Sequence, residues 1–147
     1  MVGTPLSEEE LNELLAKEKI CWLATASPKG QPHAIPINFG FFNGKVHIIF
    51  VNNNSKSVRN IKRNPSVCFG VNVGYREGEI KCALIRGKAE LIDDLDALKH
   101  AHLKILPKYL PSKEEAENFL QKLTASGAIA KRILLVIKLE KITTWKL

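Results

Sequence analysis

The sequence predicts a mainly β protein with added helices, built on an antiparallel sheet or a small barrel. Six strand-like segments are separated by turns and helices, and the strand–helix–strand rhythm of a parallel sheet does not recur. Asn43-Gly44 lies between two apolar runs and is typical of a two-residue hairpin turn. Because the chain has 147 residues, of which 45% are hydrophobic, we expect one domain over residues 1–147.

Capping residues and apolar spacing predict the helices. Ser7 and Glu10 form a capping box before a stripe of leucines, and Ser112 begins a second one. The predicted helices span residues 8–18, residues 55–63, Asp93 or Asp94 to about residue 106, and Ser112 to about residue 124. The predicted strands span residues 20–27, 32–42, 45–51, 66–73, 79–92 and 133–145. At Gly87 the missing side chain permits a bulge or a close backbone approach.

The composition leaves several partners open. The formal charge of +7 suits nucleic acid, a phosphorylated ligand or simple solubility, because its cations are spread over the chain. Cys21, Cys68 and Cys82 lie far apart without a C-x-x-C pair, so we expect buried reduced thiols instead of a disulfide framework or a zinc site. His100 and His102 point about 200° apart on a helix and do not share a metal ion there.

The sequence lacks common signals of location and of catalysis. The N-terminal stretch has no signal-peptide pattern and no apolar run has the length of a membrane span, so we expect a cytoplasmic protein. There is no G-x-S-x-G, Walker loop, G-x-G-x-x-G or H-E-x-x-H motif. We therefore predict no catalytic side chain and no metal ligand, and in an enzyme the chemistry would be supplied by a cofactor.

Pro36 lies in the middle of a predicted strand. Proline has no N–H to donate to a sheet, so Pro36 indicates an edge strand, a bulge, or backbone that faces something other than a strand. An edge strand is the simpler interpretation. In the functional interpretation the backbone from Ile35 to Asn38 faces a flat ligand, and Asn38 supplies a polar contact.

Residues 52–65 read NNNSKSVRNIKRNP and contain four cations without an acid. Ser-Lys-Ser at a helix start places backbone N–H donors, hydroxyls and an ammonium together, and this combination suits a phosphate group. Alternatively, Ser55 is only an N-cap and the basic face is solvated. On a helix, Val58 and Ile61 share one side while most of the cations face the other.

Four short motifs follow one another in a fixed order. They are L-A-T before a glycine turn, P-x-N-F, S-K-x-x-x-N-I-x-x-N-P and R-G-K-A-E. Together they resemble the pyridoxamine 5′-phosphate oxidase-like superfamily of FMN-binding split barrels, and the resemblance covers roughly residues 8 to 93. The resemblance implies a six-stranded antiparallel Greek-key split β-barrel that forms a homodimer and holds FMN in clefts between the subunits.

The resemblance also implies three groups of cofactor-binding residues. The isoalloxazine ring would lie, largely against backbone, along His33, Ile35, Pro36, Ile37 and Asn38. The ribityl chain or the ring would lie beside Phe50, Val51 and Asn52, and the phosphate would be bound by Ser55, Lys56 and Ser57. The second subunit would contribute Lys81, Cys82 and Trp145.

Two departures from the oxidase itself narrow the expected function. This chain has Lys56-Ser57 where the oxidase has an Arg-Lys pair, and KITTWKL does not match the oxidase segment that recognises substrate through arginine. Oxidation of vitamin B6 is therefore not expected. The motifs resemble more closely the branch of nitroimidazole reductase-like proteins, while related branches use the 8-hydroxy-5-deazaflavin coenzyme or bind haem.

These observations favour an FMN-binding oxidoreductase or flavin reductase-like protein, with NAD(P)H and a small molecule as possible partners. A deazaflavin-dependent reductase and a flavin-binding protein without turnover are the alternatives within the same fold. A nucleic-acid-binding module that uses the basic helix is less favoured, because only Phe50 and Phe69 flank that helix and both are expected to be buried.

Overall fold

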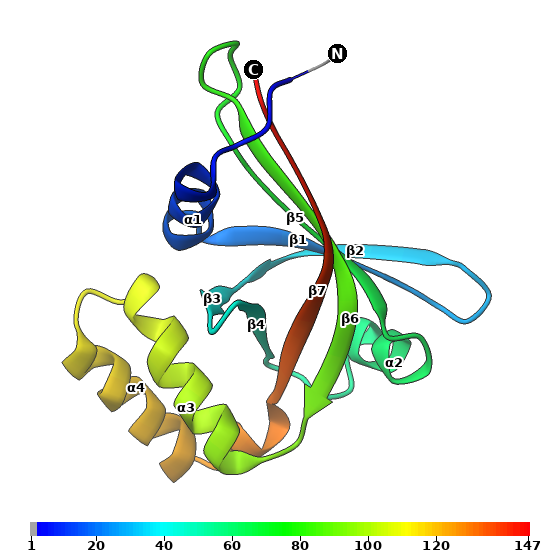
Figure 1. Ribbon diagram of the computed structural model, residues 1–147. Coiled ribbons are helices and arrows are strands. Elements are labelled where there is room, and N and C mark those ends of the chain that lie inside the picture. The colour runs from blue at the N-terminus through cyan, green and yellow to red at the C-terminus, as the bar shows by residue number, and fades with distance from the viewer. Residues whose placement is uncertain (1–2) are drawn as a thin grey trace.

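The structure is a computed structural model that describes residues 3–147 (Figure 1). Its centre is one seven-stranded sheet in the order β2-β1-β5-β6-β7-β4-β3. The strands are β1 (Ile20–Ala26), β2 (Pro32–Asn38), β3 (Gly40–Phe42), β4 (Lys45–Phe50), β5 (Ser66–Val73), β6 (Lys81–Ile92) and β7 (Ile133–Lys146). The helices are α1 (Glu8–Lys17), α2 (Lys56–Arg63), α3 (Leu95–Ile105), α4 (Lys113–Ala125) and the 3-10 helices η1 (Leu106–Lys108) and η2 (Ala128–Lys131).

All neighbouring strands pair antiparallel, which confirms the predicted mainly β class with added helices. The sheet curls, so that its edge strand β2 also contacts β4 across the opening of the half-barrel. Helices α3 and α4 form a pair between β6 and β7 in the sequence and lie together at one side of the barrel (Figure 1). This curl positions the candidate site, because it leaves a gap between β2 and β4.

The sheet has seven strands where six were expected, because the predicted strand 32–42 is divided at Phe39. The Phe39 N–H donates to Tyr109 Oη at 2.8 Å, and the Phe39 carbonyl accepts from Lys108 Nζ at 3.4 Å. Backbone groups that bond to the segment after α3 do not continue a strand ladder. The side chain of Phe39 is fully buried, so the break is fixed by packing as well as by hydrogen bonds.

Two predicted backbone features are confirmed. Asn43 and Gly44 adopt φ values of 54° and 69°, as a two-residue hairpin turn between β3 and β4 requires. The pairing of β6 with β7 shifts register between Arg86 and Gly87. A Cβ atom at Gly87 would collide with the Lys138 carbonyl, so only glycine permits this approach of the two strands.

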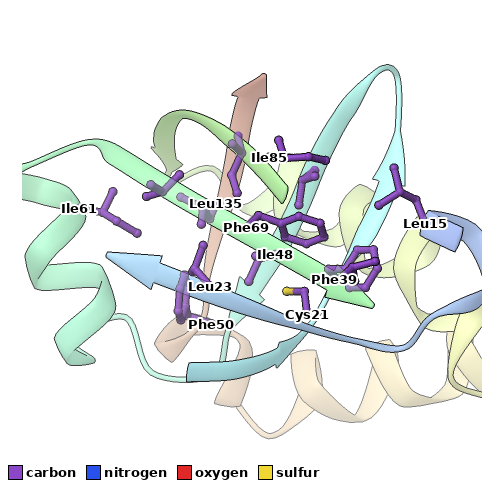
Figure 2. Packing of buried hydrophobic residues seen from close by; sticks show 14 of the residues in the cluster. Leu15, Cys21, Leu23, Phe39, Ile48, Phe50, Ile61, Phe69, Ile85 and Leu135 are labelled. Carbon is purple, nitrogen blue, oxygen red and sulfur yellow. The ribbon is translucent and has the colours of Figure 1, made fainter. Parts of the chain in front are cut away.

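The helix predictions are correct to within two residues at each end. Ser7 and Glu10 form the reciprocal capping box, Asp94 caps α3, and Ser112 accepts a hydrogen bond from the Glu115 N–H. Buried side chains from α1 and the strands fill the inside of the barrel (Figure 2). A second cluster lies between α3, α4 and the outer side of β4 and β7. In the described residues, no helix combines the length and the apolarity needed to cross a bilayer.

Candidate functional site

The turn from β4 into α2, residues 52–57, contains the predicted phosphate-binding residues. Ser55 is the N-cap of α2, and its Oγ accepts a hydrogen bond from the Val58 N–H at 3.4 Å. The N–H groups of Lys56 and Ser57 belong to the first turn, where a helix provides no acceptor. The first turn contains no acid, and Lys56 is exposed. This end of α2 therefore offers positive dipole, N–H donors and an ammonium to an anion.

Ser57 adds an observation that the sequence did not predict. Its side chain is 1% exposed, and its Oγ has no hydrogen-bond partner among residues 3–147. A buried hydroxyl without a partner costs about 1–3 kcal/mol. A ligand oxygen that bonded to this hydroxyl would remove that cost, so the residues of the 52–57 segment fit a phosphate group.

The body of α2 is fixed to the barrel. Val58 and Ile61 are buried in the barrel core, as predicted, and the other side of the helix is exposed. Asn60 Nδ2 donates to Thr25 Oγ1 of β1 at 3.1 Å in a buried hydrogen bond. This bond fixes the orientation of α2, and with it the direction of its first-turn N–H groups.

The asparagines before α2 are used mainly for local structure. Asn52 Oδ1 accepts from the Asn54 N–H at 2.9 Å, and the Asn53 N–H donates to the Lys131 carbonyl at 2.7 Å. Arg59 Nη1 donates to the Asn54 carbonyl at 2.9 Å and closes the same loop. The Asn52 NH₂ group and the second lone pair of its side-chain oxygen stay available to a ligand.

Strand β2, which carries the predicted ring-binding residues, is an edge strand. Within residues 3–147 it pairs only with β1, so Pro36 lies on an edge strand, and the edge-strand interpretation is confirmed. His33, Ile35 and Ile37 are half-buried on one face, whereas Pro36 and Asn38 are exposed on the other. The contact of this strand with a flat ligand stays a prediction.

A cavity of about 320 Å³, which we call the gap pocket, opens between β2 and β4. Its lining brings together three predicted cofactor residues, Ile37, Asn38 and Val51. The remaining lining residues are Ile49, His102, Ile105, Leu106, Tyr109 and Arg132. The predicted ring-binding strand and the end of β4 therefore share one pocket, whose far wall comes from α3 and the segments after α3 and α4.

The polar residues of the gap pocket are perturbed by burial. His102 is 2% exposed and its Nε2 has no hydrogen-bond partner in the described residues. Burial, and then the neighbouring Arg132 charge, lower the pKa of His102 to about 4, so the imidazole is neutral at pH 7. Burial also lowers the pKa of Arg132 and raises the pKa of Tyr109 to about 12.

Sequence reasoning missed these residues, because no motif links α3, η1 and Arg132 to β2. His102 was considered only as a metal ligand. Its lone position on an otherwise apolar helix face was the one available signal. In residues 3–147 the structure contains no group of three or more histidines, cysteines or acids placed to hold a metal ion.

Other predicted residues are placed differently. Phe50 is 3% exposed and its side chain belongs to the barrel core, so only its backbone is available to a cofactor. Cys82 and Trp145 are paired directly across β6 and β7. They belong to the start of β6 and the end of β7, and these strand ends lie near the chain termini and away from α2 (Figure 1). One protomer therefore does not bring them to the 52–57 segment.

Lys81 and Cys82 point to opposite faces of β6, because successive strand residues alternate. Lys81 Nζ lies 3.7 Å from Glu10 Oε2, and Lys146 Nζ lies 2.8 Å from Glu10 Oε1. The hydrogen bond from Lys146 lowers the pKa of Glu10 to about 2. Lys81 is thus engaged with α1, and Cys82 is the more available of the two for a ligand.

The outer face of the sheet carries exposed apolar side chains near β1. Strand pairing places Pro36, Trp22, Gly70 and Leu84 in one row across four strands. Trp22 is 54% exposed and its neighbour on this face, Ile20, is 50% exposed.

All three cysteines are free thiols, but only Cys21 is buried as expected, while Cys68 and Cys82 are half-buried.

A curled antiparallel sheet, open between β2 and β4 and with a helix at the end of β4, defines a split β-barrel. The sequence model described as "Pyridoxamine 5'-phosphate oxidase" matches residues 7–146, and this chain belongs to that family. No curated protein matches the sequence.

Solved structures share the fold at low sequence identity. The conserved hypothetical protein Rv2991 from Mycobacterium tuberculosis has a TM-score of 0.85 and 21% identity, over 99% of this chain and 88% of that one. A putative 5-nitroimidazole antibiotic resistance protein from Bacteroides thetaiotaomicron has a TM-score of 0.78 and 17% identity, over 97% of this chain and 86% of that one. An F420 reductase has a TM-score of 0.67 and 20% identity, over 95% and 98%. These similarities confirm the split-barrel fold.

Proposed function

We propose that this protein binds FMN at the interface of a homodimer and acts as an FMN-dependent oxidoreductase or flavin reductase-like protein. The observation that carries the proposal is the start of α2, where first-turn N–H groups, Lys56 and the unpartnered hydroxyl of Ser57 meet. Membership of the pyridoxamine 5′-phosphate oxidase family supports a flavin as the ligand. When bound, FMN would supply hydride transfer.

The residues of this chain would bind and orient the cofactor. Ser55, Lys56 and Ser57 would hold the phosphate, and the free edge of β2 would lie along the ring. The apolar surfaces of Ile37 and Val51 would exclude water from one side of it. We assign no side chain the role of general acid or base.

A second copy of the chain would complete the site. The exposed apolar row around Trp22 is a surface that a second copy would cover, since soluble monomers rarely expose such patches without a partner. A dimer across this outer face would also allow Cys82 and Trp145 of one subunit to contact the flavin of the other.

Titration of the cofactor-free protein with FMN and with riboflavin tests the phosphate site. We expect FMN to bind more tightly, because riboflavin lacks the phosphate. Lys56→Ala should weaken FMN roughly tenfold or more and leave riboflavin unchanged, since a charge-assisted bond contributes about 1.5–3 kcal/mol. Lys62→Ala, an exposed cation later on the same helix, is the matched control. Equal affinities for FMN and riboflavin would place the pocket elsewhere.

A deazaflavin-dependent reductase is the second candidate. The exposed basic face of α2, with Lys62 and Arg63 beyond the cap, suits the longer anionic tail of that coenzyme. The structural similarity to an F420 reductase is consistent with it. The same titration with the 8-hydroxy-5-deazaflavin coenzyme decides between the two cofactors.

Two alternative functions can be distinguished by simple measurements. A flavin-binding protein without turnover would load FMN but would not be reduced by NAD(P)H. A nucleic-acid-binding module would show affinity for DNA or RNA that falls steeply with salt. Phe50 and Phe69 are buried, so they do not provide stacking surfaces beside α2.

A further inference from the structure

The gap pocket has features that the flavin proposal does not use. Arg132 follows η2, is half-buried, and takes part in no salt bridge among residues 3–147. Its guanidinium lies 5.8 Å from the Phe119 ring centroid, so its known contact is with an aromatic face and not with a carboxylate. A half-buried guanidinium beside an apolar cavity retains donors for an anionic ligand.

His102 provides a second, independent observation at the same place. It lines the pocket, it is 98% buried, and its Nε2 has no hydrogen-bond partner in the part of the chain that the structure describes. Because the imidazole is neutral at pH 7, the charge of the pocket comes from Arg132 alone. A buried neutral imidazole and a half-buried cation thus both line a cavity of about 320 Å³, beside the polar side chains of Asn38 and Tyr109.

The rest of the lining indicates the size and polarity of a ligand. Ile37 and Ile49 supply aliphatic walls from β2 and β4, and Ile105 and Leu106 supply them from the end of α3. Such a cavity has the composition of a small-molecule pocket, mostly apolar with a few polar groups that set orientation.

We propose that the gap pocket binds the substrate, and that this substrate is a small, largely apolar molecule with one oxyanion group that Arg132 recognises. His102 lies beside that group as a neutral positioning residue. That the ligand is a substrate rests on the proposed flavin function. That the pocket binds a small anion depends only on the residues that line it.

Benzoate and phenyl phosphate, compared with the neutral benzamide, are suitable probes. Amide chemical shifts of the labelled protein, with and without FMN, report binding and its location. We expect both anions to bind at least tenfold more tightly than benzamide and to shift Val51 and Arg132. The ratio of the two anions distinguishes a carboxylate from a phosphate substrate.

Variants test the assigned residue. Arg132→Gln should weaken benzoate roughly ten- to hundredfold and leave benzamide unchanged, and Arg132→Lys should restore part of the loss. Lys131→Gln, an adjacent exposed cation outside the pocket lining, should change nothing. If Arg132→Gln fails to fold, the ratio of benzoate affinity to benzamide affinity in the unaltered protein still tests whether the pocket prefers an anion.

The outcomes separate this inference from the proposed function. Anion binding in protein that does not take up FMN would support the pocket and contradict the flavin proposal. FMN uptake without any preference for the anions would overturn the inference and leave the flavin proposal intact. A changed FMN reduction potential in Arg132→Gln, with unchanged benzoate affinity, would place Arg132 at the flavin and also overturn it.

Discussion

The 52–57 segment and the gap pocket differ in how the chain builds them. The first is one continuous stretch whose groups are oriented by a helix cap and by the first turn of α2. The second is assembled from β2, the end of β4, the end of α3 and Arg132, which lie far apart in the sequence. Local backbone geometry suffices for the first, whereas the second exists only when the sheet has curled and the α3–α4 pair has docked.

The two regions also differ in what holds them in place. Helix α2 is fixed to β1 by the buried bond between Asn60 and Thr25. The wall of the gap pocket is fixed by Tyr109, whose hydroxyl accepts from the Phe39 N–H and donates to the Lys19 or Phe39 carbonyl. One hydroxyl therefore fixes the end of β2 relative to the segment after α3.

The largest expected effect concerns dimerisation, which in the proposed function brings the strand ends that carry Cys82 and Trp145 of one subunit to the 52–57 segment of the other. Trp22→Glu places a carboxylate in the exposed apolar row, and burying that charge in an interface costs several kcal/mol. We expect the dimer dissociation constant to rise by roughly a hundredfold or more. Sedimentation velocity over a range of concentrations measures it.

Leu95→Glu is the control for that experiment, because Leu95 is an exposed apolar residue at the start of α3, outside the proposed interface. A monomeric unaltered protein at tens of micromolar, or a Trp22→Glu protein that stays dimeric, would contradict an interface on the outer face. The proposed contribution of Cys82 and Trp145 would then be lost as well.

The next prediction concerns the burial of His102 in the wall of the gap pocket. The unfolded chain protonates His102 near its usual pKa of 6.5, but the folded protein does so only near 4. Between these values the unfolded state binds more protons, so stability present above pH 6.5 is lost as the pH falls toward 4. The depressed pKa corresponds to about 3 kcal/mol, measured as the free energy of unfolding between pH 7 and pH 4.

His102→Gln should remove most of this pH dependence. His100→Gln, an exposed histidine on the same helix, should preserve it. Burial also lowers the pKa of His47, so the difference between the unaltered protein and His102→Gln isolates the contribution of His102. Identical pH profiles for the two proteins would contradict a buried neutral imidazole in the pocket wall.

A pair of variants tests whether the two regions are held independently. Tyr109→Phe leaves the Phe39 N–H without its partner, and Thr25→Val does the same to the Asn60 amide. Each should lower the free energy of unfolding by about 1–3 kcal/mol, measured by urea denaturation. We expect Tyr109→Phe to weaken benzoate binding more than FMN binding, and Thr25→Val to do the reverse. Equal losses of both ligands in both variants would show one coupled site.

These contrasts explain how much of the molecule could be predicted from the sequence. Caps, the Asn43-Gly44 turn, the strand edge at Pro36 and the apolar side of α2 follow from local rules, and the structure confirms them. The break at Phe39 could not be predicted, because its hydrogen-bond partner Tyr109 is far away in the chain. For the same reason Arg132 looked like one more dispersed surface cation.

Placement of the 52–57 residues was predictable to the same extent, but their burial was not. The sequence predicted Ser57 as a phosphate ligand from its position after an N-cap. It gave no reason to expect a hydroxyl that is buried without a partner, because that depends on the packing of α2 against β1 and β6. The orphaned hydroxyl is what now makes the phosphate proposal testable by stability as well as by affinity.

The smallest expected effect follows from that hydroxyl. Ser57→Ala removes a buried polar atom that has no partner, so the cofactor-free protein should keep its stability or gain up to about 1 kcal/mol. If the hydroxyl bonds to the phosphate, the same change should weaken FMN binding by about tenfold and leave riboflavin binding unaffected.

Ser66→Ala is a control. Ser66 accepts a hydrogen bond from Lys88 Nζ at the strand surface, so its loss should not alter FMN binding. A cofactor-free Ser57→Ala protein that loses more than about 1 kcal/mol would show that the hydroxyl has a partner within the fold. The stability and affinity changes have opposite signs only if the unpaired hydroxyl is kept for a ligand.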